Sequence, residues 1–227
     1  MDSGLKNQNK RLRTTHHPDN YPDDRLLLIY ETLETKHDRD SFGLTCHNFL
    51  DIQSSSRKHL RVCSLINCHA TNFLVFNMLN RFRNLDSLSL ICCRGLLNSG
   101  LANLLLYRST LQSLNLSYCS RVTDLGLSYV ASGCPFLSAV NLKKCSSITN
   151  HRLQILAESC KSLKLVHLNG RSTVTDHGIR IWAKLKILDL KMCGDLVDDA
   201  TILKIAKGCP LLQEWNLSYC YKIAISG

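Results

Sequence analysis

The sequence predicts an α/β protein: a right-handed solenoid with parallel strands on its concave face and helices on its convex face, preceded by a short all-α segment. Two observations predict it. A leucine anchor of the form L-x-x-L-x-L-x-x-C recurs at a nearly constant offset of 26 residues, and apolar residues follow it at helical spacing. One coil of this length buries little surface by itself, so stacked coils must share one continuous core.

The anchor predicts the strands. Between residues 111 and 119 its leucines alternate with polar residues around the fourth and sixth positions, which is the two-residue period of a strand with one buried face. Copies of the anchor begin at Leu60, Leu85, Leu111, Leu137, Leu163, Leu185 and Leu212. The copy at Leu60 is the weakest, with Cys63, Leu65 and Cys68 at its remaining anchor positions. We expect each copy to contribute one strand that pairs only with its neighbours.

The second half of the copy predicts a helix on the convex side. Its apolar residues fall three and four positions apart, at Val122, Leu125, Leu127, Val130 and Ala131. This spacing places them on one face of a helix. Asp124 stands where an N-cap would satisfy the free amides of the first turn. Gly133 and Pro135 predict the end of the helix, because Gly can end a helix and Pro cannot continue one.

Two coils depart from the repeat. The step from Leu163 to Leu185 is 22 residues rather than 26, and the four missing residues belong to the return turn. We therefore predict a shortened or distorted convex segment at residues 179–184, in the copy that also carries Arg171 at the cysteine position. The chain reaches Gly227 where the last helix should begin. We expect an incomplete last coil, which belongs to a longer repeat array or is covered by a partner.

The cysteines follow the repeat. Nine of the 12 lie at repeat positions, six in the anchor column (Cys68, Cys93, Cys119, Cys145, Cys193, Cys220) and three in the return turn (Cys134, Cys160, Cys209). Because free cysteine is a small and readily buried hydrophobe, we expect packed thiols in a reducing cytoplasmic and/or nuclear compartment. Thiols placed one per coil, about 4.8 Å apart, cannot surround a zinc ion, so we expect no metal and no cofactor. The longest apolar run, residues 26–30, is too short to span a membrane.

The first 59 residues differ from the repeats. Residues 1–20 are polar and basic without periodic apolar residues, so we expect a disordered tail, then a helical segment over residues 21–59 and the solenoid over residues 60–227. Pro22 begins a first helix, and a second helix is expected at residues 41–52. Leu26, Ile29 and Leu33 share one helical face. So small a segment cannot bury all its apolar surface, so these side chains either dock on a partner or pack against the first repeat.

Both parts resemble a known family. The cysteine column, the turns at residues 122–124, 148–150 and 174–176, and the pairs Cys134-Pro135 and Cys209-Pro210 resemble the cysteine-containing leucine-rich repeats of F-box/LRR proteins. The segment 21–59 resembles an F-box at Pro22, Asp24, Leu26, Ile29, Leu33, Ser41, Thr45, Cys46 and Phe49. Tyr21 and Phe49 replace the leucine and the tryptophan usual in the family. The order of the two modules resembles the plant-type F-box/LRR-repeat proteins.

The resemblance implies a function. It implies a substrate-recognition adaptor subunit of an SCF-type E3 ubiquitin ligase, in which the F-box binds a Skp-family adaptor, and through it a cullin, while the repeats bind the target protein. The adaptor contacts that it implies are Pro22, Leu26, Ile29, Leu33, Cys46 and Phe49. The alternative is a protein-interaction scaffold of the same fold that engages no ligase. Catalytic motifs such as a P-loop or H-E-x-x-H are absent from the sequence, so we expect no enzyme.

The concave face is the expected surface for the target. Candidate contacts on it are Asn115, Asn141, Lys143, Lys144, His167 and Lys191. From Arg61 onward the chain carries 19 Lys and Arg against 9 Asp and Glu, so the solenoid holds the whole net charge of +10. This charge favours an acidic or phosphorylated protein partner, and the alternative is an ordinary solvated face. Nucleic acid would bind there without sequence specificity, because the inner face lacks aromatic residues for base stacking.

Overall fold

The computed structural model of the protein describes residues 23–63, 68–106, 110–170, 182–193 and 197–223. The chain divides into two compact units, Met1–Ser56 and Arg57–Gly227. Each unit has its own cluster of buried apolar side chains. The boundary predicted from the sequence, between residues 59 and 60, falls inside the first strand of the second unit.

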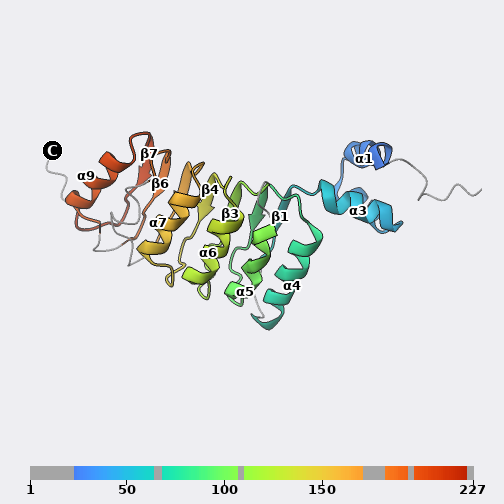
Figure 1. The fold of residues 1–227 in the computed structure, drawn as a ribbon, viewed down its shortest axis with the longest axis horizontal. Coiled ribbons are helices and arrows are strands. Elements are labelled where there is room, and N and C mark those ends of the chain that lie inside the picture. The colour runs from blue at the N-terminus through green and yellow to red at the C-terminus, as the bar shows by residue number, and fades with distance from the viewer. Residues whose placement is uncertain (1–22, 64–67, 107–109, 171–181, 194–196, 224–227) are drawn as a thin grey trace, which may run out of the picture. The chain divides into compact units, whose positions relative to one another are not determined.

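The first unit contains three described helices, α1 (Asp23–Thr32), α2 (Lys36–Gly43) and α3 (His47–Ser56) (Figure 1). Their core is formed by the buried side chains of Leu26, Tyr30 and Ile52. Phe42 and Phe49 pack against this core, with their rings stacked 4.2 Å apart. Aromatic rings contribute much apolar area for their number, which allows so short a segment to form a core at all.

The helix predicted at residues 41–52 is wrong, because the chain is helical on both sides of a break at residues 44–46. The amide of Leu44 donates to the carbonyl oxygen of Ser41, and α2 ends there. A Cβ at Gly43 would lie 2.2 Å from Oε1 of Gln53, so the absence of a side chain lets α3 approach closely. The apolar spacing continues across the break because both helices supply a phenylalanine to the same core.

The second unit is built on a parallel sheet whose seven described strands follow the order of the sequence. They are β1 (His59–Arg61), β2 (Ser87–Ser89), β3 (Ser113–Asn115), β4 (Ala139–Asn141), β5 (Leu165–His167), β6 (Ile187–Asp189) and β7 (Glu214–Asn216). The middle residue of each strand lies opposite the middle residue of the next, from Leu60 and Leu88 through to Leu188 and Trp215. The predicted strands and their parallel order are confirmed.

The first repeat has a different alignment from the one predicted. Leu60 pairs with Leu88 and therefore occupies the fourth position of the anchor, not the first. Val62 takes the sixth position, Cys63 is exposed, and the helix α4 begins at Cys68. Assigning Cys68 to the cysteine column was wrong for this reason. Residues 60–68 happen to match the spacing of the anchor. The alignment of this repeat is instead set by the strand pairing, in which Leu60 is buried opposite Leu88 of the next coil.

The five other cysteines of the column join neighbouring coils. Each buried thiol points at a backbone carbonyl oxygen of the preceding coil: Cys93 at Val62 (3.8 Å), Cys119 at Leu90 (3.0 Å), Cys145 at Leu116 (3.0 Å), Cys193 at Leu168 (3.3 Å) and Cys220 at Leu190 (3.3 Å). The side chain is therefore a hydrogen-bond donor as well as a packing group. The carbonyl groups of Leu90, Leu116 and Leu190 also accept a backbone amide, so the thiol provides a second hydrogen bond that alanine could not.

The return-turn cysteines lie at the ends of the helices and are also buried. The thiol of Cys160 donates to the carbonyl oxygen of Cys134 in the preceding coil, at 3.2 Å. Burial raises the pKa of Cys134 and Cys160 to about 12 and that of Cys209 to about 11. These three cysteines and the five buried cysteines of the column are free thiols. Thiols with such raised pKa values are poor nucleophiles, so these cysteines are structural.

Helices cover the side of the sheet opposite its exposed strand face (Figure 1). The described ones are α4 (Cys68–Arg81), α5 (Asn98–Leu101) with the 3-10 helix η2 (Ala102–Leu106), α6 (Asp124–Gly133), α7 (Asn150–Ser159) and α9 (Asp199–Gly208). At Gly133 a Cβ would lie 2.3 Å from the backbone oxygen of Leu104, so the chain needs a glycine where α6 passes the coil before it. Within the described residues, no helix is both long enough and apolar enough to cross a membrane.

The predicted N-cap of α6 is wrong by one residue. Thr123 is the N-cap, and its hydroxyl accepts from the amide of Leu125 at 3.4 Å. Asp124 instead accepts the backbone amide and the hydroxyl of Thr149 in the next coil, both at 2.7 Å. Asn98 accepts the amide of Thr123 in the same way, at 3.0 Å. The first residue of these helices therefore caps the following coil, a partner that single-helix reasoning does not consider.

The short coil keeps its place in the sheet. Leu165 on β5 lies opposite Ile187 on β6, so the strand pairing is intact across the 22-residue step. Of the segment predicted to be distorted, residues 179–181 lie outside the described residues, as does Arg171. Trp182 is buried with 3% of its surface exposed, and the chain turns at residues 183–184 into β6.

Replacing Cys119 with alanine should destabilise the repeats. The change removes the donor that joins this coil to the Leu90 carbonyl and leaves a small void, so we expect the free energy of unfolding to fall by about 1–2 kcal/mol. Urea denaturation followed by circular dichroism measures it. The matched control is Cys63→Ala at an exposed cysteine, with an expected change within about 0.5 kcal/mol. Equal losses in the two variants would show that the buried thiol has no special role.

Candidate interaction surfaces

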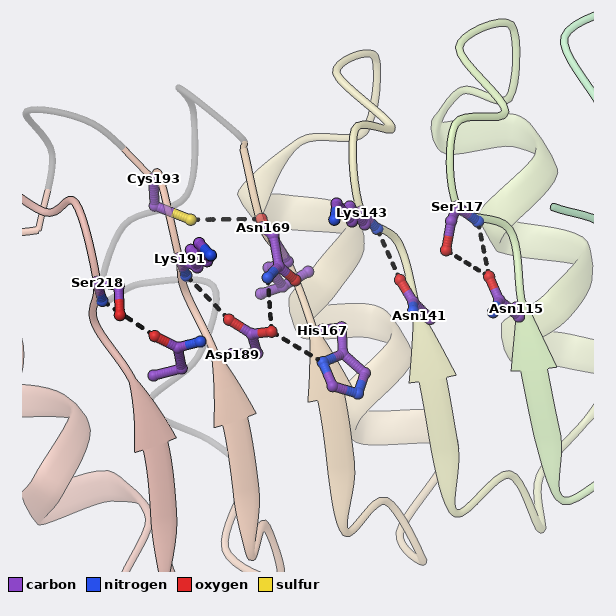
Figure 2. A network of polar contacts seen from close by, with 12 residues as sticks. Asn115, Ser117, Asn141, Lys143, His167, Asn169, Asp189, Lys191, Cys193 and Ser218 are labelled. Atoms are coloured by element: carbon purple, nitrogen blue, oxygen red, sulfur yellow. Dashed lines mark hydrogen bonds and ion pairs between the residues drawn. The ribbon is translucent and has the colours of Figure 1, made fainter. Parts of the chain in front are cut away.

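The last residues of the strands form a polar row across the sheet. Asn115, Asn141, His167, Asp189 and Asn216 lie opposite one another in neighbouring strands, each partly exposed (Figure 2). Lys143 and Lys191 follow two residues after β4 and β6, and Lys144 is exposed beside Lys143. The structure thus brings the predicted target-binding residues together on one face.

The polar row also shapes the turn that follows each strand. Side-chain oxygens accept the backbone amide two residues later: Asn115 from Ser117 (2.9 Å), Asn141 from Lys143 (3.0 Å), Asp189 from Lys191 (3.0 Å) and Asn216 from Ser218 (3.0 Å). The next residue has a positive φ, 62° at Tyr118, 58° at Lys144, 59° at Met192 and 63° at Tyr219. Residues other than glycine seldom adopt this conformation, so the Asx turn holds each of these side chains at a set place on the edge of the sheet.

Two tyrosines at these positions lie beside lysines. The Nζ of Lys143 is 5.5 Å from the ring centre of Tyr118, and that of Lys191 is 5.3 Å from the ring centre of Tyr219. Both rings keep part of their surface exposed, 37% and 57%. These tyrosines were not predicted from the sequence, and the inner face was expected to lack aromatic residues. Both stand directly before a cysteine of the column, and this position could have indicated that they lie beside the strand ends.

His167, Asn169 and Asp189 form a hydrogen-bonded group next to Lys191 (Figure 2). The Oδ2 atom of Asp189 lies 3.2 Å from Nδ1 of His167 and 2.5 Å from Nδ2 of Asn169, while Oδ1 accepts the amide of Lys191. Burial raises the pKa of Asp189, but the hydrogen bonds from Asn169, Lys191 and His167 outweigh burial and leave it below its usual 3.8. The carboxylate is therefore held in its charged form and fixes the orientation of the imidazole.

The first residues of the central strands form an apolar row that the sequence analysis also missed. Ala139, Leu165 and Ile187 lie opposite one another on β4, β5 and β6, and each is partly exposed. Together with the polar row and the lysines they make one surface with an apolar and a cationic side. We call it the β4–β6 surface, formed by Ala139, Asn141, Lys143, Lys144, Leu165, His167, Ile187, Asp189 and Lys191.

The helical unit separates the predicted adaptor contacts into two groups. Leu26 is buried in the core of the unit, and Leu33, Cys46 and Phe49 are partly buried. Ile29 keeps 48% of its surface exposed, while Pro22 lies outside the described residues. Two further apolar side chains are exposed, Leu28 at 62% and Leu44 at 85%. The spacing of the apolar residues in the sequence does not tell which face of the helix points outward. The packing of the three helices decides it, with Leu26 inside and Leu28 outside.

No group of three or more His, Cys, Asp or Glu side chains in the described part of the chain could hold a metal ion. The described side-chain hydrogen bond of His167 is to Asp189, and no hydroxyl or thiol is described as its partner. The surfaces described above are suited to binding, in which charge and apolar area act together.

Replacing Asp189 with asparagine should reduce stability in a pH-dependent way. Because the folded-state pKa is lowered, charged Asp189 stabilises the fold fully above the unfolded-state pKa, and this stabilisation disappears as the pH falls through the folded-state pKa. We expect Asp189→Asn to lower the free energy of unfolding by about 1 kcal/mol near neutral pH, allowing for solvent screening, and by less in acid. Urea denaturation at a series of pH values measures the difference. The control is Glu158→Gln, at an exposed position on α7, and a pH-independent difference for Asp189→Asn would contradict the prediction.

Comparisons with known proteins agree with the repeat and the fold. A family model described as Leucine Rich repeat matches residues 108–131. F-box/LRR-repeat protein 12 of Arabidopsis thaliana is 38% identical over 94 residues, which are 37% of this chain and 24% of that protein. A chain in the crystal structure of the yeast Rad7 and Elc1 complex has a similar fold, with a TM-score of 0.64 and 20% identity over 79% of this chain and 54% of that one. By its anchor and its fold the chain contains a leucine-rich-repeat solenoid, and over part of its length it is similar to a plant F-box/LRR-repeat protein, of which it spans about a quarter.

Proposed function

We propose that the protein is the substrate-recognition subunit of an SCF-type E3 ubiquitin ligase, in which the helical unit binds a Skp-family adaptor and the strand face of the repeats binds the target protein. The order of the two modules carries the proposal. A three-helix segment with exposed apolar side chains comes directly before cysteine-type repeats. The plant relative supports it, because its name pairs an F-box with the same kind of repeat.

The helical unit provides the apolar surface that an adaptor requires. Leu28, Ile29 and Leu44 are exposed, whereas Leu26 and Tyr30 hold the unit together. Fully burying one leucine or isoleucine side chain stabilises a complex by about 1.5–3 kcal/mol. Exposed apolar side chains on so small a unit are costly in water and therefore favour a docking role.

The proposed mechanism is proximity. The helical unit would fix one end of the chain to the ligase, and the repeats would hold the target near the charged ubiquitin carrier. Holding two reactants together raises their effective concentration, so the chain need not perform chemistry itself. The yeast Rad7 and Elc1 complex, in which a chain of this fold occurs with a second protein, supports a repeat protein that works within an assembly.

The proposed location is the cytoplasm and/or the nucleus. The free, buried thiols of the repeats support it, because a reducing compartment keeps such thiols from forming disulfides. Several of these thiols also have a role in the fold, because they donate to a carbonyl oxygen of the neighbouring coil. A reducing compartment therefore preserves the contacts between coils.

A scaffold that engages no ligase is the second candidate. Three of the six predicted adaptor contacts serve the core of the helical unit, since Leu26 is buried and Leu33 and Phe49 pack against the core. Of these predicted contacts, an adaptor would therefore meet chiefly Ile29, together with exposed side chains outside the pattern such as Leu28. In the scaffold, the exposed leucines would contact some other protein.

The double substitution Leu28→Asp, Ile29→Asp should abolish binding to a Skp-family adaptor while leaving the repeats folded. Charges placed at exposed apolar positions would have to be buried on docking, which costs far more than the apolar contact gives. Co-purification of the full chain with a Skp-family adaptor, followed by biolayer interferometry, measures the binding. Both residues are exposed, so the substitution spares the core that Leu26→Asp would disrupt.

The matched control is Leu203→Asp, at a leucine on α9 with 62% of its surface exposed. This variant carries the same kind of change in the other unit and should bind the adaptor as the unaltered chain does. If the unaltered chain binds no Skp-family adaptor at all, the ligase proposal is wrong and the scaffold is favoured. Equal binding by all three proteins would show that the adaptor docks elsewhere.

A further inference from the structure

We infer that the β4–β6 surface binds an acidic, extended segment of the partner protein, with an apolar side chain of that segment on Leu165 and its carboxylates on Lys143 and Lys191. The inference rests on the proposed function only in that the repeats bind a protein. It adds the chemical class of the partner segment and the place where that segment lies.

The charge of the surface is the first argument. Lys143, Lys144 and Lys191 stand against a single carboxylate, Asp189. Both oxygens of that carboxylate are already hydrogen-bonded within the chain, to His167 and Asn169 on one side and to the Lys191 amide on the other. Asp189 therefore orients its neighbours, while the lysines set the sign of the surface that a partner meets. Oppositely charged surfaces of this kind accelerate association and exclude partners of the same sign.

The unused donors are the second argument. The Oδ1 atom of Asn141 accepts the Lys143 amide, which leaves its Nδ2 available to a partner. Nδ1 of His167 donates to Asp189, so Nε2 of the neutral ring is an acceptor and adds no donor for a carboxylate. Figure 2 shows these side chains side by side on neighbouring strands, below the two lysines. The amide of Asn141 and the ammonium groups of the two lysines are hydrogen-bond donors for a carboxylate.

The apolar row is the third argument, and it points to a peptide. Ala139, Leu165 and Ile187 lie side by side and partly exposed next to the polar row. A ligand that satisfies both rows needs an aliphatic side chain close to its carboxylates, which a segment of Asp, Glu and Leu residues provides. Burying such a side chain supplies affinity, and the charges supply orientation and specificity.

The same residues disfavour the other anions. Bidentate recognition of phosphate groups uses the planar guanidinium of arginine, and the described residues of β4–β6 and their following turns contain lysines, which act only as point charges, and no arginine. Nucleic acid needs open aromatic faces for its bases, whereas a lysine already lies over each of Tyr118 and Tyr219. Glu214, opposite Ile187, places a negative charge on β7 and limits the surface on that side.

The test uses the full chain and a short fluorescein-labelled peptide of alternating glutamate and leucine, measured by fluorescence anisotropy. We expect saturable binding that weakens with added salt. The double substitution Lys143→Glu, Lys191→Glu should weaken binding at least about tenfold, because it places like charges opposite one another. Leu165→Ser should also weaken binding, and a peptide with glutamine in place of glutamate should bind poorly.

The matched control is Lys161→Glu, Lys207→Glu, which makes the same change of charge at exposed lysines outside the β4–β6 surface. It should leave the peptide affinity within about twofold of that of the unaltered chain. If the control loses as much affinity as the surface variant, binding depends on net charge alone and the inference fails. It also fails if a single-stranded oligonucleotide or a phosphoserine peptide of equal length displaces the glutamate peptide at lower concentration.

Adaptor binding by the same variants separates this inference from the proposed function. The surface variant should bind a Skp-family adaptor as well as the unaltered chain does. A chain that binds the adaptor but not the acidic peptide would overturn the inference alone. A chain that binds the peptide through the β4–β6 surface but no adaptor would support the inference and overturn the ligase proposal.

Discussion

Contact between neighbouring coils is the constraint on which the repeat unit depends. A three-residue strand with one buried leucine has no core of its own, so each coil is stable only when the next one covers it. The strands meet residue for residue, as at Leu88 and Leu114, and the column thiols add a hydrogen bond across the same junction. Neighbouring backbones must also approach closely, which is why Gly133 faces a carbonyl group of the coil before it.

This constraint explains which parts of the fold could be predicted from sequence. The strand positions can be predicted from the leucine spacing, because moving such a leucine out of the core would expose apolar surface in its own coil and in the neighbouring coil. The pairing of Leu165 with Ile187 is kept across the 22-residue step for the same reason. The errors arose where a contact outside the local pattern decides the outcome. Leu60 takes its alignment from Leu88, Asp124 caps the next coil, and α2 ends where Gln53 packs on Gly43.

The interaction surfaces were predicted less completely than the fold. Asn141, His167 and Lys191 were recognised because polar residues between buried leucines must face solvent. Leu165 and Ile187 share that face but were missed, since an apolar residue beside the anchor leucines looks like core in one dimension. In the helical unit, spacing alone grouped Leu26 with Ile29. The three-helix core separates them, burying the first and exposing the second.

The turns with positive φ after the strands have a consequence for how such a protein can diversify. The conformation at Tyr118, Lys144, Met192 and Tyr219 is held by an amide or carboxylate side chain three residues earlier, not by the residue itself. The backbone conformation therefore does not depend on which residue occupies this turn position, and the four turns present an aromatic ring, an ammonium group or a thioether there. Because the side chain at this position can change while the backbone stays the same, new binding specificities can evolve or be engineered one coil at a time.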